Sequence, residues 1–87
     1  MRVISQDGTL DMPYEEVIIQ RFKSRIYFLN KNLTGVESLA EYSTEEKAVK
    51  AMEMLREAWI NEAIEFTHGI YHRNIVFQFP QDDEIEV

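Results

Sequence analysis

The sequence predicts an α+β fold in which an antiparallel sheet of about five strands carries one long amphipathic helix on one face. Three observations predict it. Short segments rich in β-branched and aromatic residues fill much of residues 2–42. A segment with apolar residues at helical spacing follows them, and a last alternating segment precedes Pro80. With 87 residues and no cysteine, the chain has room for one small domain that no disulfide stabilises.

The strands are predicted from alternation and from the residues that interrupt it. Residues 2–5 and 10–12 flank an Asp7-Gly8 turn, which supplies the positive φ angle that a tight hairpin needs. Residues 16–22 and 25–30 form a second pair, in which alternation leaves apolar side chains on both faces. A loop is expected over 31–37, a short strand over 38–42 and a last strand over 74–79.

The helix is predicted over about 22 residues that follow Ser43. Ser43-Thr44-Glu45-Glu46 fits a capping box, in which the Ser43 hydroxyl accepts a hydrogen bond from a first-turn amide. Gly69 predicts the end of the helix, and a break near Asn61 is left open. Apolar residues recur at steps of three or four, and Trp59 is expected to anchor the core; the stripe consists of Ala48, Met52, Leu55, Trp59, Ala63 and Phe66.

The negative charge is unevenly distributed. The chain has 9 Lys and Arg against 16 Asp and Glu, a formal net charge of −7, and four of the acidic residues follow Pro80. A run of like charge at a chain end favours solvent. We therefore expect a single α+β domain over residues 1–80 and an acidic, disordered tail over residues 81–87.

Apolar strands on both faces of a small sheet predict self-association. One helix covers only one face, so apolar residues of the other face remain exposed unless a second molecule covers them. A basic segment around Arg21, Lys23 and Arg25 and an acidic helix also give the chain complementary surfaces. We therefore predict a homodimer formed through the open face or edge of the sheet, with the interface residues Ile18, Phe22, Tyr27, Leu29 and Val76.

No pattern in the sequence is typical of an enzyme. There is no cysteine nucleophile, the three glycines form no phosphate-binding loop, and no serine lies in a nucleophile elbow. His68 and His72 are separated by Gly69, which interrupts the helical spacing that a pair of metal ligands needs. We expect no catalytic residue, no metal and no cofactor.

Two alternatives involve nucleic acid. Residues 21–25 combine basic and aromatic side chains that could bind a single strand, and the acidic helix and tail could imitate nucleic acid on another protein. The small basic footprint and the overall negative charge disfavour the first; Lys47, Lys50 and Arg56 interrupt the acidic helix and disfavour the second. We expect a protein partner instead, besides the chain itself.

The hydropathy of the chain predicts no membrane partner. No apolar run approaches the roughly 20 residues that cross a bilayer, and the first residues lack the apolar region of a signal peptide. We expect a cytoplasmic protein.

Three segments carry a resemblance to a known family: residues 1–15 (MRVISQDGTLDMPYE), 41–56 (EYSTEEKAVKAMEMLR) and 77–80 (FQFP). In this order they resemble a family of small uncharacterised bacterial proteins that often accompany prophages and other mobile elements. The resemblance implies no catalytic or binding residue. Members of this family vary between the helix and the last strand, here residues 58–74, so it implies that specificity for a partner lies there or on the sheet face.

Overall fold

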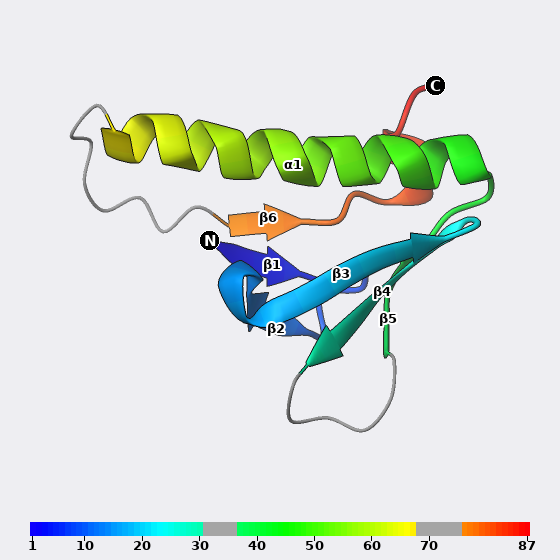
Figure 1. Cartoon of the computed structure of the whole chain (residues 1–87). Helices are drawn as coiled ribbons and strands as arrows, with labels where there is room; N and C mark the ends of the chain where they lie inside the picture. The colour runs from blue at the N-terminus through cyan, green and yellow to red at the C-terminus, as the bar shows by residue number, and fades with distance from the viewer. Residues whose placement is uncertain (31–36, 68–75) are drawn as a thin grey trace.

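The computed structural model describes residues 1–30, 37–67 and 76–87 (Figure 1). Within these ranges six strands form two three-stranded sheets, and one long helix runs along one side of the molecule (Figure 1). The α+β class is confirmed. The single antiparallel sheet is wrong, because the strands divide into the orders β2-β1-β6 and β3-β4-β5.

The first sheet joins the two ends of the chain. Strand β1 (Arg2–Ile4) pairs antiparallel with β2 (Asp11–Pro13) and parallel with β6 (Val76–Gln78). A parallel pair needs a long crossover connection, and the chain between β1 and β6 supplies it. The predicted turn between β1 and β2 is confirmed: Gly8 has a φ of +78°, and the Asp7 carboxylate accepts hydrogen bonds from the Ser5 hydroxyl and the Thr9 amide.

The sheet divides after Pro13. Proline has no amide hydrogen for a ladder, and a short 3-10 helix (Tyr14–Glu16) follows it directly. This turn redirects the chain, so that β3 (Val17–Phe22) begins a second sheet instead of extending the first.

The second sheet is an antiparallel meander. Strand β3 pairs with β4 (Arg25–Asn30) along six residues, and a two-residue turn at Lys23 and Ser24 joins them. Lys23 has a φ of 54°, as expected at the first position of the tight turns that connect hairpins. Strand β4 then pairs with β5 (Glu37–Glu41), with an irregular register between Ile26 and Tyr27.

Helix α1 (Glu45–Thr67) is continuous through Asn61, and its position and length confirm the prediction. Its first turn is capped by Thr44 and not by Ser43 as predicted, because the Lys47 amide donates to Thr44 Oγ1 at 3.2 Å. Ser43 bonds instead to the C-terminal segment. The predicted stop at Gly69 lies outside the described residues.

The core lies between α1 and the two sheets. The helix contributes Ala48, Ala51 and Leu55 from the predicted stripe and its flank. Trp59 is not a core anchor: it is 36% exposed and packs on Tyr14, with ring centroids 4.9 Å apart. The remaining buried apolar side chains come from all parts of the chain: Val3, Met12, Ile26, Phe28, Leu39, Ala40, Tyr42, Phe79 and Ile85.

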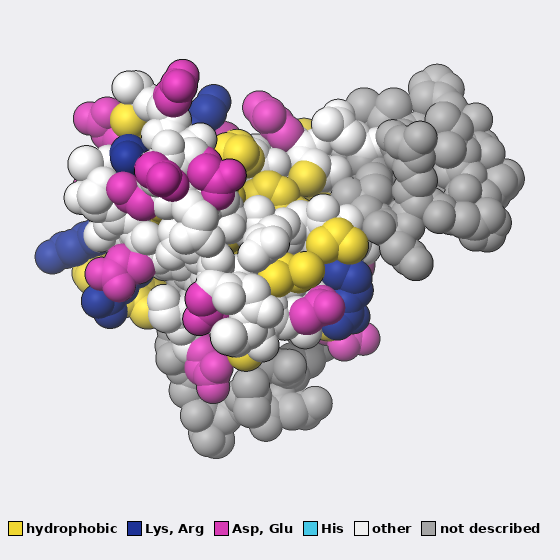
Figure 2. Space-filling view, turned by 180° about the vertical axis from the view of Figure 1, so that it is seen from behind, with side chains coloured by type: hydrophobic (Ala, Val, Ile, Leu, Met, Phe, Trp, Pro, Cys, Tyr) yellow, Lys and Arg dark blue, Asp and Glu magenta, His cyan; other side chains and the backbone are white. Residues whose placement is uncertain are grey.

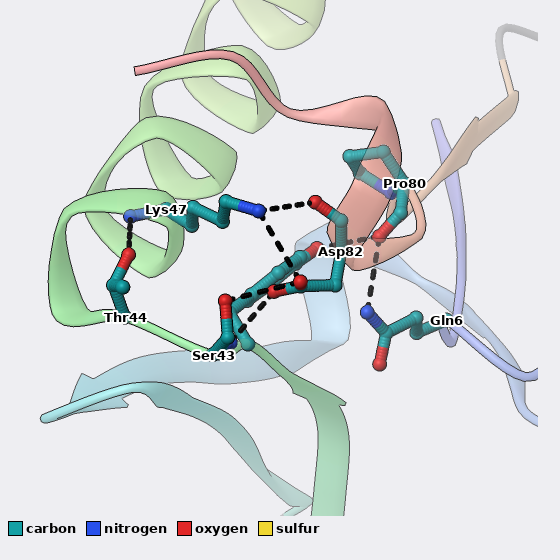
Figure 3. Close-up of polar contacts among 7 residues, drawn as sticks. Gln6, Ser43, Thr44, Lys47, Pro80 and Asp82 are labelled. Atoms are coloured by element: carbon teal, nitrogen blue, oxygen red, sulfur yellow. Dashed lines mark hydrogen bonds and ion pairs between the residues drawn. The ribbon is translucent and has the colours of Figure 1, made fainter.

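Residues 81–87 pack against the domain, which differs from the disordered tail that their charge predicted. Ile85 is only 4% exposed and belongs to the core. Asp82, in a second 3-10 helix (Asp82–Glu84), accepts hydrogen bonds from the Ser43 amide and hydroxyl at 2.6 and 3.0 Å (Figure 3). Lys47 donates to the Asp82 carboxylate at 3.2 Å and to its carbonyl at 2.9 Å. One acidic residue, Asp82, thus bonds to donors at the start of α1, and one apolar side chain in the charged run, Ile85, anchors the segment in the core.

A further set of hydrogen bonds holds Pro80 beneath the start of α1. Its carbonyl accepts from the Tyr42 hydroxyl at 2.9 Å and from Gln6 Nε2 at 3.2 Å (Figure 3). Burial, with the nearby charges of Asp82 and Glu84, raises the pKa of Tyr42, so its hydroxyl stays protonated as a donor.

Candidate functional site

Four of the five predicted interface residues lie together on one face of the β3–β4 pair. The register pairs Ile18 with Leu29, Gln20 with Tyr27 and Phe22 with Arg25. Side chains directly opposite each other in an antiparallel pair point to the same face. We name this surface the hairpin face, and it consists of Ile18, Gln20, Phe22, Arg25, Tyr27 and Leu29.

The hairpin face is the outer face of the second sheet. The alternate residues of β4, Ile26 and Phe28, are buried on the other side of the sheet at 0% and 5% exposure. On the hairpin face, Ile18 and Phe22 are 59% and 64% exposed, while Tyr27 and Leu29 are half-buried. Two large apolar side chains therefore face solvent beside two others that are only partly covered.

Val76 does not belong to this surface. It lies on β6 in the other sheet, where it pairs with Arg2 and is 54% exposed. Conversely, the structure places Gln20 at the centre of the hairpin face, between Ile18 and Phe22. The prediction missed Gln20 because it considered only apolar residues, although the alternation of residues 18, 20 and 22 would have placed it there.

The free edge of β3 adjoins the hairpin face. A two-residue turn makes Phe22 and Arg25 a hydrogen-bonded pair, so Phe22, Gln20 and Ile18 direct their amides and carbonyls towards β4. The Tyr42 amide donates to the Ser24 carbonyl at 2.9 Å. This bond agrees with the alternation, because it shows that even-numbered residues at the start of β4 direct their backbone groups towards β5. Ile19 and Arg21 therefore direct their backbone groups away from the sheet, and no described strand pairs with that side of β3.

The other edge of the same sheet is closed by the β1–β2 turn. The Gln6 amide donates to the Leu39 carbonyl of β5 at 2.8 Å, and Gln6 Oε1 accepts from the Glu41 amide at 3.0 Å. Capping an edge strand in this way prevents it from pairing with another chain. Of the two edges of this sheet, the described residues cap the one formed by β5 and leave the one formed by β3 open.

Charge changes sign along β3. The strand follows Glu15 and Glu16, while Arg21 lies near its other end and Lys23 in the turn that follows. Arg21 forms an ion pair with Glu45 at 2.9 Å, and the Lys23 ammonium lies 5.6 Å from the centre of the Phe22 ring. One end of the open edge is thus acidic and the other basic.

The predicted basic segment is partly neutralised within the chain. Besides the Arg21–Glu45 pair, Arg25 contacts Glu41 at 3.1 Å, and hydrogen bonding to the Tyr27 side chain, followed by Glu41, raises the pKa of Arg25. Figure 2 shows the side turned away in Figure 1, where acidic side chains are spread over the surface with hydrophobic ones in separate groups between them. Both observations weaken the attraction of the described surface for phosphate.

The described residues contain no group of three or more His, Asp or Glu side chains that could hold a metal ion. His68 and His72 lie outside the described residues, as do residues 68–74 of the segment 58–74, whose first part lies in α1. One open hollow at the start of α1 is lined by Thr44, Glu45, Glu46 and Val49, and another by Gln78, Phe79, Pro80, Gln81 and Glu84. No helix within residues 1–30, 37–67 and 76–87 has the length and apolar character required to span a membrane.

Comparisons with protein-family models, with curated proteins and with solved structures found no match.

Proposed function

We propose that the protein is a non-enzymatic interaction module that self-associates through the hairpin face and the adjoining edge of β3. The observation that carries this proposal is the exposure of Ile18 and Phe22, 59% and 64%, on one face beside Tyr27 and Leu29. Single exposed apolar residues are common on protein surfaces, but neighbouring ones on one sheet face indicate a binding surface. A second protein, encoded by the host or by a mobile element, would act on the assembled module.

Self-association is better supported than phosphate recognition. Arg21 and Arg25, which would contact a nucleic acid, already bond to Glu45 and Glu41. A phosphate binder loses affinity steeply as salt rises, whereas an interface of apolar side chains does not. Titration with single-stranded and duplex DNA at two salt concentrations therefore separates the two functions.

Light scattering coupled to size exclusion tests the proposal directly. We expect the wild-type chain to show the mass of a dimer above about 10 μM, a weak affinity typical of small interfaces. Ile18→Ser and Phe22→Ser should each shift the protein to the mass of a monomer, since each removes an exposed apolar side chain from the hairpin face.

Val87→Ser is the matched control, because Val87 is 68% exposed but lies in the C-terminal segment and is part of neither β3 nor β4. It should leave the dimer intact. A wild-type chain that stays monomeric up to millimolar concentration, with native circular dichroism, would exclude the proposed function.

A further inference from the structure

We propose that two copies of the chain pair antiparallel along β3 and form one continuous six-stranded sheet. The order of strands would be β5-β4-β3 followed by β3-β4-β5 of the second copy. This inference rests on the proposed self-association and adds its geometry: the edge of β3 forms hydrogen bonds and the hairpin face provides apolar contacts. Addition of a strand to an exposed sheet edge is a common mode of protein recognition.

The backbone of β3 restricts the possible registers. Only Ile19 and Arg21, with Val17 at the start of the strand, direct backbone amides and carbonyls outward. Hydrogen-bonded pairs across the new interface must therefore join these odd-numbered residues. Every antiparallel register that satisfies this condition places even-numbered residues opposite even-numbered residues on the hairpin face.

The apolar side chains select one of these registers. If Gln20 lies opposite Gln20 of the second copy, Ile18 of each copy lies opposite Phe22 of the other. The two most exposed apolar residues of β3 then cover each other twice, and the two Gln20 amides between them can hydrogen-bond. A shift by two residues in one direction would place Ile18 opposite Gln20 and Phe22 opposite Glu16. A shift in the other direction would place Phe22 opposite Gln20 and Ile18 opposite Ser24, so both shifts leave the apolar side chains without apolar partners.

The charges at the two ends of β3 favour the antiparallel orientation. In the register centred on Gln20, Ser24 lies opposite Glu16 of the second copy, next to Lys23 and Arg25. The acidic start of each strand thus meets the basic turn of the other copy. A parallel arrangement would place like charges together at both ends, which is unfavourable. A second copy of this chain is therefore a complementary occupant of the open edge.

A single introduced cysteine tests the register, because the chain contains no cysteine of its own. Gln20→Cys would place two thiols in a non-hydrogen-bonded pair, where Cα atoms lie about 4.5 Å apart, within the range of a disulfide. We expect Gln20→Cys to form a covalent dimer under mild oxidation roughly a hundredfold faster than the control variant, because the dimer holds the thiols at high effective concentration.

Ser38→Cys is the matched control. Ser38 is exposed on the same sheet and pairs with Tyr27, but in the proposed dimer two copies of Ser38 are five strand spacings apart, about 24 Å. No disulfide can span this distance. Non-reducing electrophoresis and light scattering of both variants report the covalent and the non-covalent dimer.

The outcomes distinguish this inference from the proposed function. A dimer mass with slow cross-linking of Gln20→Cys, or with equal rates for both variants, would overturn pairing along β3 and leave self-association through another surface. A monomer mass for the wild type and both variants would overturn the inference and the proposed function together. Fast cross-linking of Gln20→Cys, together with slow cross-linking of Ser38→Cys, supports both the pairing along β3 and the proposed self-association.

Discussion

At the scale of single residues, short-range hydrogen bonds determine how the chain responds to acid. The Asp7 carboxylate accepts from the Ser5 hydroxyl, the Thr9 amide and the Thr9 hydroxyl at 2.7–3.0 Å. These bonds lower the pKa of Asp7 from 3.8 to about 2, since each donor stabilises the charged form. Asp82 shows the same direction of change, caused first by the Ser43 amide and then by the Ser43 hydroxyl and Lys47.

The lowered pKa of Asp7 predicts a loss of stability in acid. Its folded pKa lies below the unfolded value, so its contribution is complete above about pH 4 and is lost as pH falls towards 2. Urea unfolding followed by circular dichroism should therefore show a midpoint that drops over this range. Asp7→Asn should be less stable at neutral pH and lose less stability on acidification. An identical pH dependence in both proteins would contradict this assignment.

At the scale of elements, the C-terminal segment behaves as part of the domain. Ile85 is 4% exposed, while Val87 two residues later is 68% exposed. We expect Ile85→Ala to lower the free energy of unfolding by about 2–4 kcal/mol, as for a large-to-small substitution in a core. Val87→Ala should change it by less than about 0.5 kcal/mol, as for a surface substitution.

Chemical denaturation of both variants measures the difference. Equal stability of Ile85→Ala and Val87→Ala would show that residues 81–87 do not pack on the domain in solution. A short peptide of residues 81–87 added to the Ile85→Ala variant should not restore stability. The variant's own residues 81–87 are covalently connected to Pro80, so their effective concentration at the site exceeds that of the added peptide.

Local elements could be predicted from sequence because their signals are local. The Asp7-Gly8 turn, the two strands joined at Lys23 and the helix each follow from residues close to each other along the chain. The assignment of β6 to the first sheet could not be predicted in this way. It depends on the parallel pairing of β1 with β6, whose partners Val3 and Phe77 are brought together only by the complete fold.

The predicted tail and interface show the same difference between local signals and long-range contacts. The tail was predicted from the charge of residues 81–87, which gave no indication that Ile85 is buried, because its burial depends on contacts with distant parts of the chain. For the hairpin face, alternation predicted which residues of β3 and β4 share a side, and the register confirmed it. Val76 was included on alternation alone, and its sheet could not be known without the long-range pairing.

At the scale of the whole molecule, the change of charge along β3 predicts how two copies orient. Glu16 and Lys23 are exposed, and neither forms an ion pair with another described residue. At low ionic strength we expect Glu16→Lys and Lys23→Glu each to weaken dimerisation about two- to fivefold, as for exposed charge pairs. The double variant should restore the wild-type affinity, since the signs are again complementary across an antiparallel pair.

Sedimentation equilibrium of the four proteins measures these affinities. Parallel pairing would predict no restoration by the double variant, because like residues would remain neighbours. Added salt should reduce the differences among the four proteins, since ions in solution screen the interaction between solvent-exposed charges.

The pairing of β1 with β6 also determines when the first sheet can form during translation. Val3 and Phe77 occupy adjacent strands, and Phe79 beside them is among the most deeply buried side chains. A nascent polypeptide cannot complete this arrangement until β6 has emerged from the ribosome. One edge of the β1–β2 hairpin therefore stays uncovered until all residues up to β6 have been translated, and the first sheet is completed only then.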